Sequence, residues 1–251
     1  MPPPLLYVFQ ISHYCEKVRW ALDHLRIDYT LKVVPPGAHR AMAARFGLSR
    51  SSVPFLVGAD GALQESAAII AWAERHATDE VAPLQPADER ARSIEARLDD
   101  VAGVHVRRYF YSAALIDDPK PVKAMFADGL SVPHKVLHQV TWPTVRKVMI
   151  RSMDIGHAQG DESRDVLDAE LTWLDELLAG GRTYLCDDRF TRVDITAASL
   201  WAPLVLPPEH PAYAGMPVLQ RLQGDLERWR DRPAFSWVRE LYARHREAEH
   251  G

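Results

Sequence analysis

The sequence predicts an α+β protein in which a small mixed sheet with helices precedes an all-helical part. In the first 78 residues, apolar runs of strand length alternate with helix-like apolar periodicity, which favours a small sheet covered by helices. After Asp88 the apolar residues recur with helical spacing. We therefore expect two domains: a sheet-containing domain over residues 1–78, a linker over residues 79–87 and an all-α helical bundle domain over residues 88–251.

The N-terminal elements are expected in the order strand, helix, strand, helix, strand, strand, helix. Residues 5–10 form a short apolar and aromatic run that is typical of a buried strand. From about Tyr14 the apolar residues recur on one helical face, which predicts a helix. Asp60 and Gly61 predict a hairpin turn between two brief strands. The other expected elements are strands over 29–34, Phe55–Gly58 and 63–65, and helices over 39–46 and Ser66–His76.

Prolines and glycines divide the C-terminal part into helices of different lengths. One long helix is expected over residues 88–115, whereas four prolines predict short or kinked helices between residues 117 and 160. A helix over 162–179 is expected to stop at Gly180 and Gly181. Further helices are expected from Thr191, over 217–230 and after Pro233.

One C-terminal motif specifies where a helix begins. Thr191 and Asp194 have the spacing of a capping box, and Phe190 and Ile195 stand at the positions of a hydrophobic staple. These residues are expected to direct folding and to take no part in chemistry.

Composition and charge restrict the class of protein. The 251 residues are 47% hydrophobic and carry a net charge of -4, which is ordinary for a globular protein and gives no reason to expect a nucleic-acid partner. Cys15 and Cys186 make no disulfide framework, so a reducing compartment and a cytoplasmic location are expected. No signal peptide is recognisable, and no apolar stretch reaches the length of about 18 residues needed to span a membrane.

The segment Ser12-His13-Tyr14-Cys15 joins the first strand to the first helix. A helix N-terminus offers free N–H groups and a positive dipole end, which stabilise a thiolate. Ser12 either donates its hydroxyl to such a thiolate or serves only as an N-cap, and the four residues by themselves favour the cap.

Two other junctions have the chemistry of a peptide-binding site. If the Val53-Pro54 bond is cis, the backbone of Val53 points outward and can pair with a peptide-like ligand; a trans proline there is structural. Ser66 is expected to cap a helix whose N-terminus can hold a carboxylate, and Glu65 can accept from an ammonium group. The alternative for this pair is an N-cap beside a solvated Glu65.

Taken in order, these features resemble the cytosolic glutathione transferase family, and within it the serine-type, bacterial-like members. The resemblance spans most of the chain and is weakest between residues 112 and 160. It rests on the segments LYVF at 6–9, SHYCEKVRWAL at 12–22, VPFL at 53–56, QESAAI at 64–69, TRVDI at 191–195 and RPAF at 232–235.

The resemblance implies a thioredoxin-like N-terminal domain that binds glutathione as co-substrate. Ser12 matches the serine that activates the glutathione thiol, and Cys15 matches the second cysteine position of glutaredoxin-like relatives. Val53, before Pro54, would pair with the cysteinyl backbone of glutathione. The other expected glutathione-binding residues are Tyr14, Ser52, Glu65 and Ser66, of which the last two would hold the γ-glutamyl end.

The chain departs from the family pattern in two places. Residues 48–52 are extra where the family has a tight turn, so Arg50 or Ser52 replaces the usual contacts to the glycine end of glutathione. His39 and Arg40 resemble a His-Lys pair that meets this glycine carboxylate in the phi class. His13 replaces the common proline, and either influences thiol ionisation as part of the catalytic group or faces solvent.

The expected activity is conjugation of the glutathione thiolate to a small hydrophobic electrophile by a homodimeric enzyme. The walls of the second pocket would include the long helix that carries His105, Arg108, Tyr109 and Tyr111, although these tyrosines are better explained as packing. The alternatives are thiol-disulfide oxidoreductase chemistry through Cys15, and a binding module without turnover.

Two further features lie in the C-terminal part. Residues 119–153 carry six basic residues and one acid, which is either an anion or partner surface or a solvated face. His134 and His138 are four residues apart but have no evident third ligand, so no metal is expected.

Overall fold

The computed structural model describes residues 2–50, 52–85, 88–186 and 188–246, and the chain divides into two units. The first unit comprises Met1–Gln85 and Lys123–Val145, and the second comprises Pro86–Val122 and Arg146–Gly251. Two residues of the expected linker, 86 and 87, and Ser51 of the extra segment lie outside the described residues. The expected domain boundaries stay a prediction, and the units differ from them in grouping residues 123–145 with the N-terminal part.

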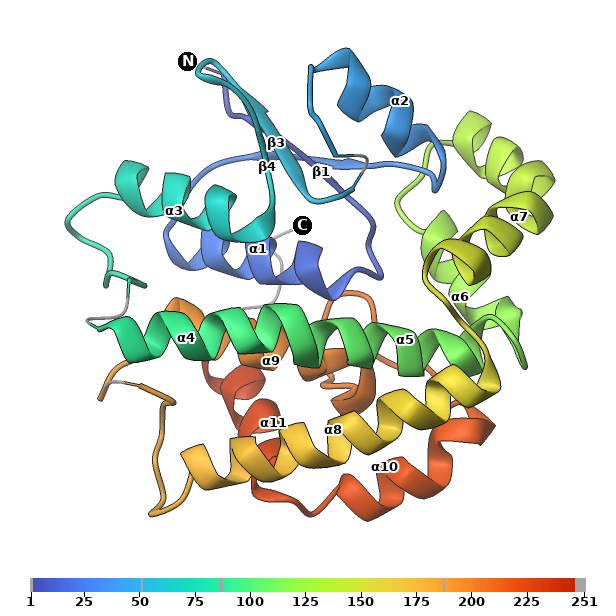
Figure 1. Cartoon of the computed structure of the whole chain (residues 1–251). Helices are drawn as coiled ribbons and strands as arrows, with labels where there is room; N and C mark the ends of the chain where they lie inside the picture. The colour runs from blue at the N-terminus through green and yellow to red at the C-terminus, as the bar shows by residue number, and fades with distance from the viewer. Residues whose placement is uncertain (1, 51, 86–87, 187, 247–251) are drawn as a thin grey trace. The chain divides into compact units, whose positions relative to one another are not determined.

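The first unit contains a four-stranded mixed sheet with the strand order β2-β1-β3-β4 (Figure 1). β1 is parallel to β2 and antiparallel to β3, and β3 is antiparallel to β4. The predicted order of strands and helices is confirmed. β4 begins earlier than expected because Gly58 pairs directly with Gly61 across a two-residue turn. The strands are β1 Leu5–Val8, β2 Thr30–Val33, β3 Phe55–Gly58 and β4 Gly61–Gln64.

Helices cover both faces of this sheet. Alternate residues of β1 point to opposite faces, so Leu6 and Val8 are fully buried on one side while Tyr7 packs on the other, stacked on Phe55 at 4.5 Å between ring centroids. Residues of α2 join the Tyr7 cluster, whereas α1 and α3 contact each other on the opposite side of the sheet (Figure 1). These helices are α1 His13–His24, α2 Ala38–Arg45 and α3 Ser66–His76.

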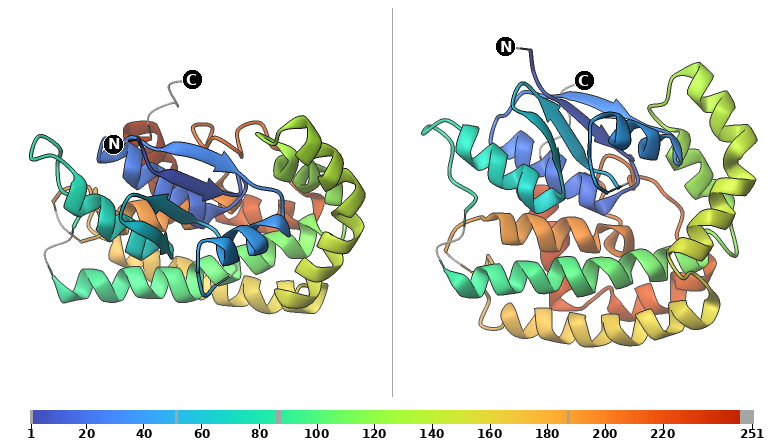
Figure 2. Two further views of the ribbon diagram at one scale, coloured as in Figure 1. Left: turned by 90° about the horizontal axis from the view of Figure 1, so that it is seen from above. Right: turned by 45° about the horizontal axis from the view of Figure 1, so that its top comes forward.

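A helical hairpin formed by α6 (Pro119–Ala127) and α7 (Val132–Ser152) contributes residues 123–145 to the first unit (Figures 1 and 2). Short or kinked helices were predicted here; α7 is not short, since it continues for 21 residues through Pro143. Pro143 lies on an exposed side of the helix, where water can satisfy the carbonyl that loses its N–H partner.

The second unit is all-helical in the part that the structure describes. The long helix expected over 88–115 is confirmed as a continuous run of α4, one π-helical turn and α5. α9 is buried along nearly its whole length and contacts α4, α5 and α11. The elements are α4 Glu89–Arg97, η1 Leu98–Ala102, α5 Gly103–Ala114, α8 His157–Leu177, α9 Arg192–Val205, η2 Gln220–Leu222, α10 Gln223–Trp229 and α11 Pro233–His245.

The start of α9 confirms the predicted capping box. The carboxylate of Asp194 accepts from the backbone N–H of Thr191 at 2.8 Å and from its hydroxyl at 2.9 Å. It also accepts from the backbone N–H of Leu185 at 2.8 Å, so the same side chain fixes the preceding loop.

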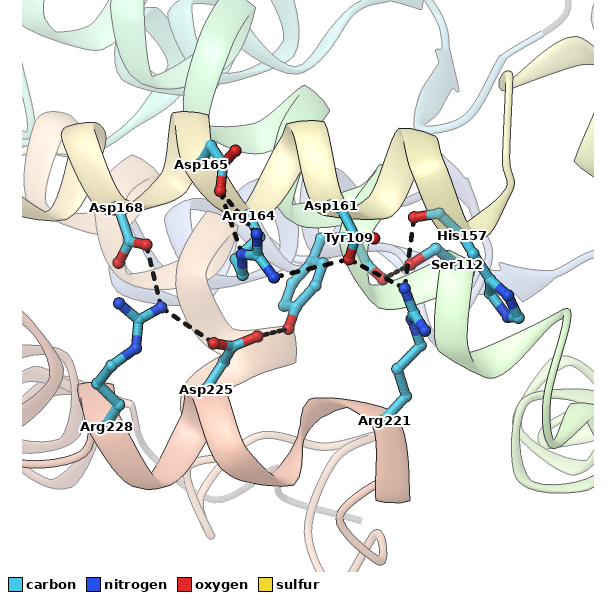
Figure 3. Close-up of polar contacts among 10 residues, drawn as sticks. All are labelled: Tyr109, Ser112, His157, Asp161, Arg164, Asp165, Asp168, Arg221, Asp225 and Arg228. Carbon is cyan, nitrogen blue, oxygen red and sulfur yellow. Dashed lines mark hydrogen bonds and ion pairs between the residues drawn. The ribbon is translucent and has the colours of Figure 1, made fainter.

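Alternating acidic and basic side chains connect α8 with η2 and α10 (Figure 3). Arg221 donates to Asp161 at 3.0 Å, and Arg228 pairs with both Asp168 and Asp225 at 3.0 Å. The hydroxyl of Tyr109, from α5, donates to Asp225. These contacts hold three helices of the second unit together.

Candidate functional site

The junction between β1 and α1 places Ser12 at the N-terminus of a helix. Ser12 is the N-cap of α1, and its Oγ accepts from the backbone N–H of Cys15 at 3.3 Å. The capping alternative is therefore confirmed. Capping uses a lone pair of the hydroxyl oxygen and leaves its proton to be donated to another acceptor, so the cap does not exclude the second role.

Cys15 lies one turn into α1 with its side chain only 1% exposed. Burial raises the pKa of the Cys15 thiol to about 11, although hydrogen bonds with Ser12 and Phe9 oppose the shift. The thiol is consequently protonated at neutral pH and shielded from solvent, which is unfavourable for a nucleophile.

His13 and Tyr14 complete the tetrapeptide. His13 is buried, so the alternative that its ring faces solvent was wrong. The ring lies against the half-buried Tyr14 with a centroid distance of 4.5 Å.

The loop before β3 contains a cis peptide bond between Val53 and Pro54. Pro54 is buried, and Val53 packs at the edge of the cluster around Tyr7 and Phe55. The cis alternative for this bond is therefore confirmed.

The junction between β4 and α3 differs in detail from the prediction. Ser66 was expected to cap α3, but it is the first residue of the helix and Glu65 occupies the cap position. Glu65 has φ 76° and ψ 132°, a backbone conformation rarely adopted by residues with a side chain. Its carboxylate makes no capping hydrogen bond and pairs with Arg50.

The extra segment of residues 48–52 brings a cation to this junction. The guanidinium of Arg50 lies 3.0 Å from the carboxylate of Glu65. Arg50 or Ser52 was expected at the glycine end of glutathione, whereas Arg50 meets the residue expected at the γ-glutamyl end. The exposed Ser52 accepts through its carbonyl from Gln64 at 3.1 Å.

The start of α2 holds the two other expected binding residues. His39 accepts through Nδ1 from the backbone N–H of Gly37 at 3.0 Å, and its ring meets Phe9 edge-on at 4.9 Å. Arg40 is exposed. Because Phe9 accepts through its carbonyl from the backbone N–H of Ser12 at 3.1 Å, His39 lies beside the segment that leads into Ser12.

Sequence reasoning missed the contribution of the α6–α7 hairpin. Phe126 meets Phe9 edge-on at 5.6 Å between centroids. A Cβ added at Gly129 would lie 2.9 Å from a methyl of Val33 and 3.2 Å from the side chain of Gln10, so the hairpin turn approaches the β1–α1 loop closely. This segment is where the family resemblance is weakest, and only the apolar Phe126 before the turn glycine hinted at such packing.

The residues expected to line a second pocket from α5 have partners within the helical unit. Tyr109 packs edge-on against Trp229 at 5.8 Å, which confirms the packing interpretation. Arg108 pairs with Asp154 at 3.0 Å and with Glu162 at 2.9 Å.

The basic residues and the histidines of residues 119–153 have different environments. Lys135, Lys147 and Arg151 are exposed, as the solvated-face alternative requires. Buried His138 donates through Nε2 to the carbonyl of Lys123 at 3.0 Å. Over the described ranges, no group of three or more His, Cys, Asp or Glu side chains is arranged to hold a metal.

Residues 6–80 match the family model of the glutathione S-transferase N-terminal domain. This part of the chain is similar to the N-terminal domain of the glutathione S-transferase family. The match includes Ser12, Val53, Pro54, Glu65 and Ser66. A comparison with curated protein sequences finds no match.

Solved structures of glutathione transferases have the same fold over nearly the whole chain. Glutathione transferase GSTFuA3 from Phanerochaete chrysosporium is 16% identical with a TM-score of 0.64, and the match covers 99% of each chain. A glutathione S-transferase from Methylobacterium radiotolerans in complex with glutathione sulfonate is 23% identical, with a TM-score of 0.51 and coverage of 94% of this chain and 93% of that one. Beta-etherase LigF from Sphingobium sp. strain SYK-6 is 22% identical, with a TM-score of 0.54 and coverage of 95% and 99%. These similarities establish the fold: a thioredoxin-like domain followed by a helical region.

The helices were also compared with the requirements for crossing a membrane. Of the helices in the described part of the chain, none combines the length and the apolar character needed to cross a bilayer.

Proposed function

We propose that this protein binds glutathione and transfers its thiolate to a small hydrophobic electrophile. The observation that carries the proposal is the position of Ser12, at the N-terminus of α1 in a glutathione S-transferase N-terminal domain. A hydroxyl at this position can donate to the sulfur of a thiolate while the helix N-terminus stabilises the negative charge.

Glutathione would bind along the end of the sheet that carries these loops. The backbone of Val53 pairs with the cysteinyl residue, and Glu65 with Ser66 holds the γ-glutamyl group. Support comes from the relative from Methylobacterium radiotolerans, whose structure contains glutathione sulfonate. The remaining contacts are assigned to Tyr14, His39, Arg40 and Ser52.

The proposed reaction requires that the protein lower the pKa of the glutathione thiol. A free thiol has a pKa of about 8.5, so little thiolate exists at neutral pH. Donation from Ser12 and the field of α1 lower the pKa of the bound thiol, and the resulting thiolate attacks the electrophile. The half-buried Phe9 and His39, with the buried Phe126 packed against Phe9, supply an aromatic surface for an apolar second substrate.

Thiol-disulfide exchange through Cys15 is less well supported. A nucleophilic cysteine needs an accessible thiolate, but Cys15 is buried and its pKa is raised to about 11. A binding module without turnover differs from our proposal in one respect: it would hold glutathione without ionising it.

Calorimetric titration with glutathione tests the first half of the proposal. Wild-type protein is expected to bind glutathione, and Ser66→Ala to bind it more weakly because the γ-glutamyl carboxylate loses a hydrogen bond. Absence of binding by the wild type would refute the proposal. Binding followed by no reaction with any electrophile would leave the binding-module alternative.

The proposal also includes a homodimer, as the family resemblance implies, and a cytoplasmic location, as the two cysteines favour. Light scattering on the purified protein checks its oligomeric state, and a mass of one chain, 28.3 kDa, would contradict this part.

A further inference from the structure

Arg50 occupies a position that the proposed function does not explain. It belongs to the extra residues 48–52, where the chain departs from the family pattern. Its guanidinium lies 3.0 Å from the carboxylate of Glu65, and both side chains are more than half exposed, at 69% and 53%. An exposed pair of this kind adds little to stability, so stability alone is a weak reason for the contact.

The backbone around Arg50 is held in place by a neighbouring side chain. Gln64, the last residue of β4, accepts from the backbone N–H of Arg50 at 3.0 Å and donates to its carbonyl at 2.6 Å. The same amide nitrogen donates to the carbonyl of Ser52 at 3.1 Å. Gln64 therefore fixes the backbone of Arg50 directly beside Glu65 and Ser66, the residues expected to hold the γ-glutamyl group.

The charges at this junction complement an α-amino acid headgroup. Such a headgroup carries an ammonium and a carboxylate on the same carbon atom. An ammonium that approaches Glu65 also approaches the guanidinium of Arg50, which repels it. The adjacent carboxylate of the ligand removes this conflict, because it can accept from Arg50 while the ammonium donates to Glu65. The two charges of the headgroup would then alternate in sign with those of Arg50 and Glu65.

We propose that Arg50 is a glutathione-binding residue that donates to the α-carboxylate of the γ-glutamyl group, with its guanidinium positioned by Glu65 and its backbone by Gln64. This inference rests on the proposed function, since it assumes that glutathione binds at this junction. It assigns to the extra segment a role in recognising the free amino acid end of the ligand.

The test compares the binding of two ligands by the wild type and by two arginine variants. Affinities for glutathione and for γ-aminobutyryl-cysteinyl-glycine, which lacks only the α-carboxylate, are measured by calorimetry on wild type and Arg50→Gln. The substitution is expected to weaken glutathione binding by about fivefold, as for an exposed charge-assisted contact. The affinity for the analogue is expected to rise, because its ammonium is then no longer repelled by Arg50. The loss should shrink as salt is added. Arg45→Gln, which removes another exposed arginine of the same unit, controls for net charge.

Three results would overturn the inference. Tighter glutathione binding by Arg50→Gln would show that Arg50 competes with the ligand for Glu65. An equal loss for both ligands would show that Arg50 only supports the loop. Unchanged glutathione affinity would remove Arg50 from the site and leave the proposed function standing, whereas a wild type that binds neither ligand refutes the proposed function itself.

Discussion

At the residue scale, Ser12 and Cys15 show how burial gives two chemically related side chains different properties. Ser12 caps α1 and Cys15 lies in its first turn, where a helix dipole favours negative charge. Ser12 is only partly buried at the start of the helix, while Cys15 is enclosed. For Cys15 the cost of burying a thiolate exceeds the benefit of the dipole, as the raised pKa shows.

Asp194 gives a pH-dependent contribution to stability. Burial raises its pKa to about 6 from 3.8 in spite of its hydrogen bonds. Between these values the folded state binds more protons than the unfolded state, so the free energy of unfolding falls as pH rises, by about 3 kcal/mol for this group alone. Stability from this group is complete below about pH 4 and lost above about pH 6.

Urea unfolding of wild type and Asp194→Asn isolates this effect from the other carboxylates. The variant is expected to be less stable at every pH because Thr191 and Leu185 lose an acceptor. The gap between the two proteins should be wider near pH 4 than near pH 7. A gap that widens with rising pH would mean that the pKa of Asp194 lies below its usual value.

Much of the candidate site was predictable at the residue scale because its residues act through local backbone geometry. Ser12 at a helix start and Glu65 at a strand–helix junction follow from the order of elements. The cap position of Glu65 was not predictable, since a serine is the more common cap and the positive φ of Glu65 depends on how β4 meets α3. The Arg50–Glu65 pair joins residues 15 apart and depends on the path of a loop with no local pattern.

At the scale of elements, the close approach of α5 and α8 depends on two small residues. A Cβ added at Gly160 would lie 2.2 Å from Oγ and 2.7 Å from Cβ of Ser112, which is itself fully buried. Ser112 also donates to the carbonyl of Tyr109 at 2.7 Å, which fixes its side chain (Figure 3). The helices therefore have no room to accept a methyl group.

Gly160→Ala is expected to destabilise the protein by about 1–3 kcal/mol through overpacking, measured by urea unfolding. Gly224→Ala is the matched control, because Gly224 is also helical and nothing lies within 4 Å of an added Cβ. The control should be neutral or stabilising by about 0.5–1 kcal/mol. Equal effects of the two substitutions would contradict the close packing of α5 on α8.

The α6–α7 hairpin is the element through which packing reaches the proposed site. Gly129 has φ +69°, and an added methyl would meet Val33 and Gln10. Gly215 has nearly the same φ, +73°, with nothing within 4 Å, so it isolates backbone strain from steric conflict. Both alanine substitutions are expected to lose about 1–2 kcal/mol from the strain of the left-handed conformation.

Only Gly129→Ala is expected to raise the KM for an electrophilic substrate as well, because it displaces the hairpin that holds Phe126 against Phe9. Steady-state kinetics on both variants measure this difference. A normal KM in Gly129→Ala would remove the hairpin from the substrate surface that we propose.

At the scale of the whole molecule, the sequence predicted the class and order of elements better than their grouping. Alternating apolar patterns, turn glycines and the Thr191–Asp194 box are local signals, and each element they specify is present. The grouping of residues 123–145 with the N-terminal unit is a matter of long-range packing, which local periodicity does not encode. The length of α7 was not predictable from Pro143 either. A proline interrupts a helix less where water can bond the carbonyl that loses its N–H partner, and this exposure depends on the fold.

The proposed transferase activity depends on whether Ser12 lowers the pKa of a bound thiol, and ultraviolet absorbance of the thiolate measures this directly. In the wild type the pKa of bound glutathione is expected to lie at least about one unit below the free value of about 8.5. Ser12→Gly, which keeps most of the capping stability, should lose this shift, while Ser12→Thr should retain it. An identical thiol pKa in wild type and Ser12→Gly, or an unshifted pKa in the wild type, would contradict the proposed role of Ser12.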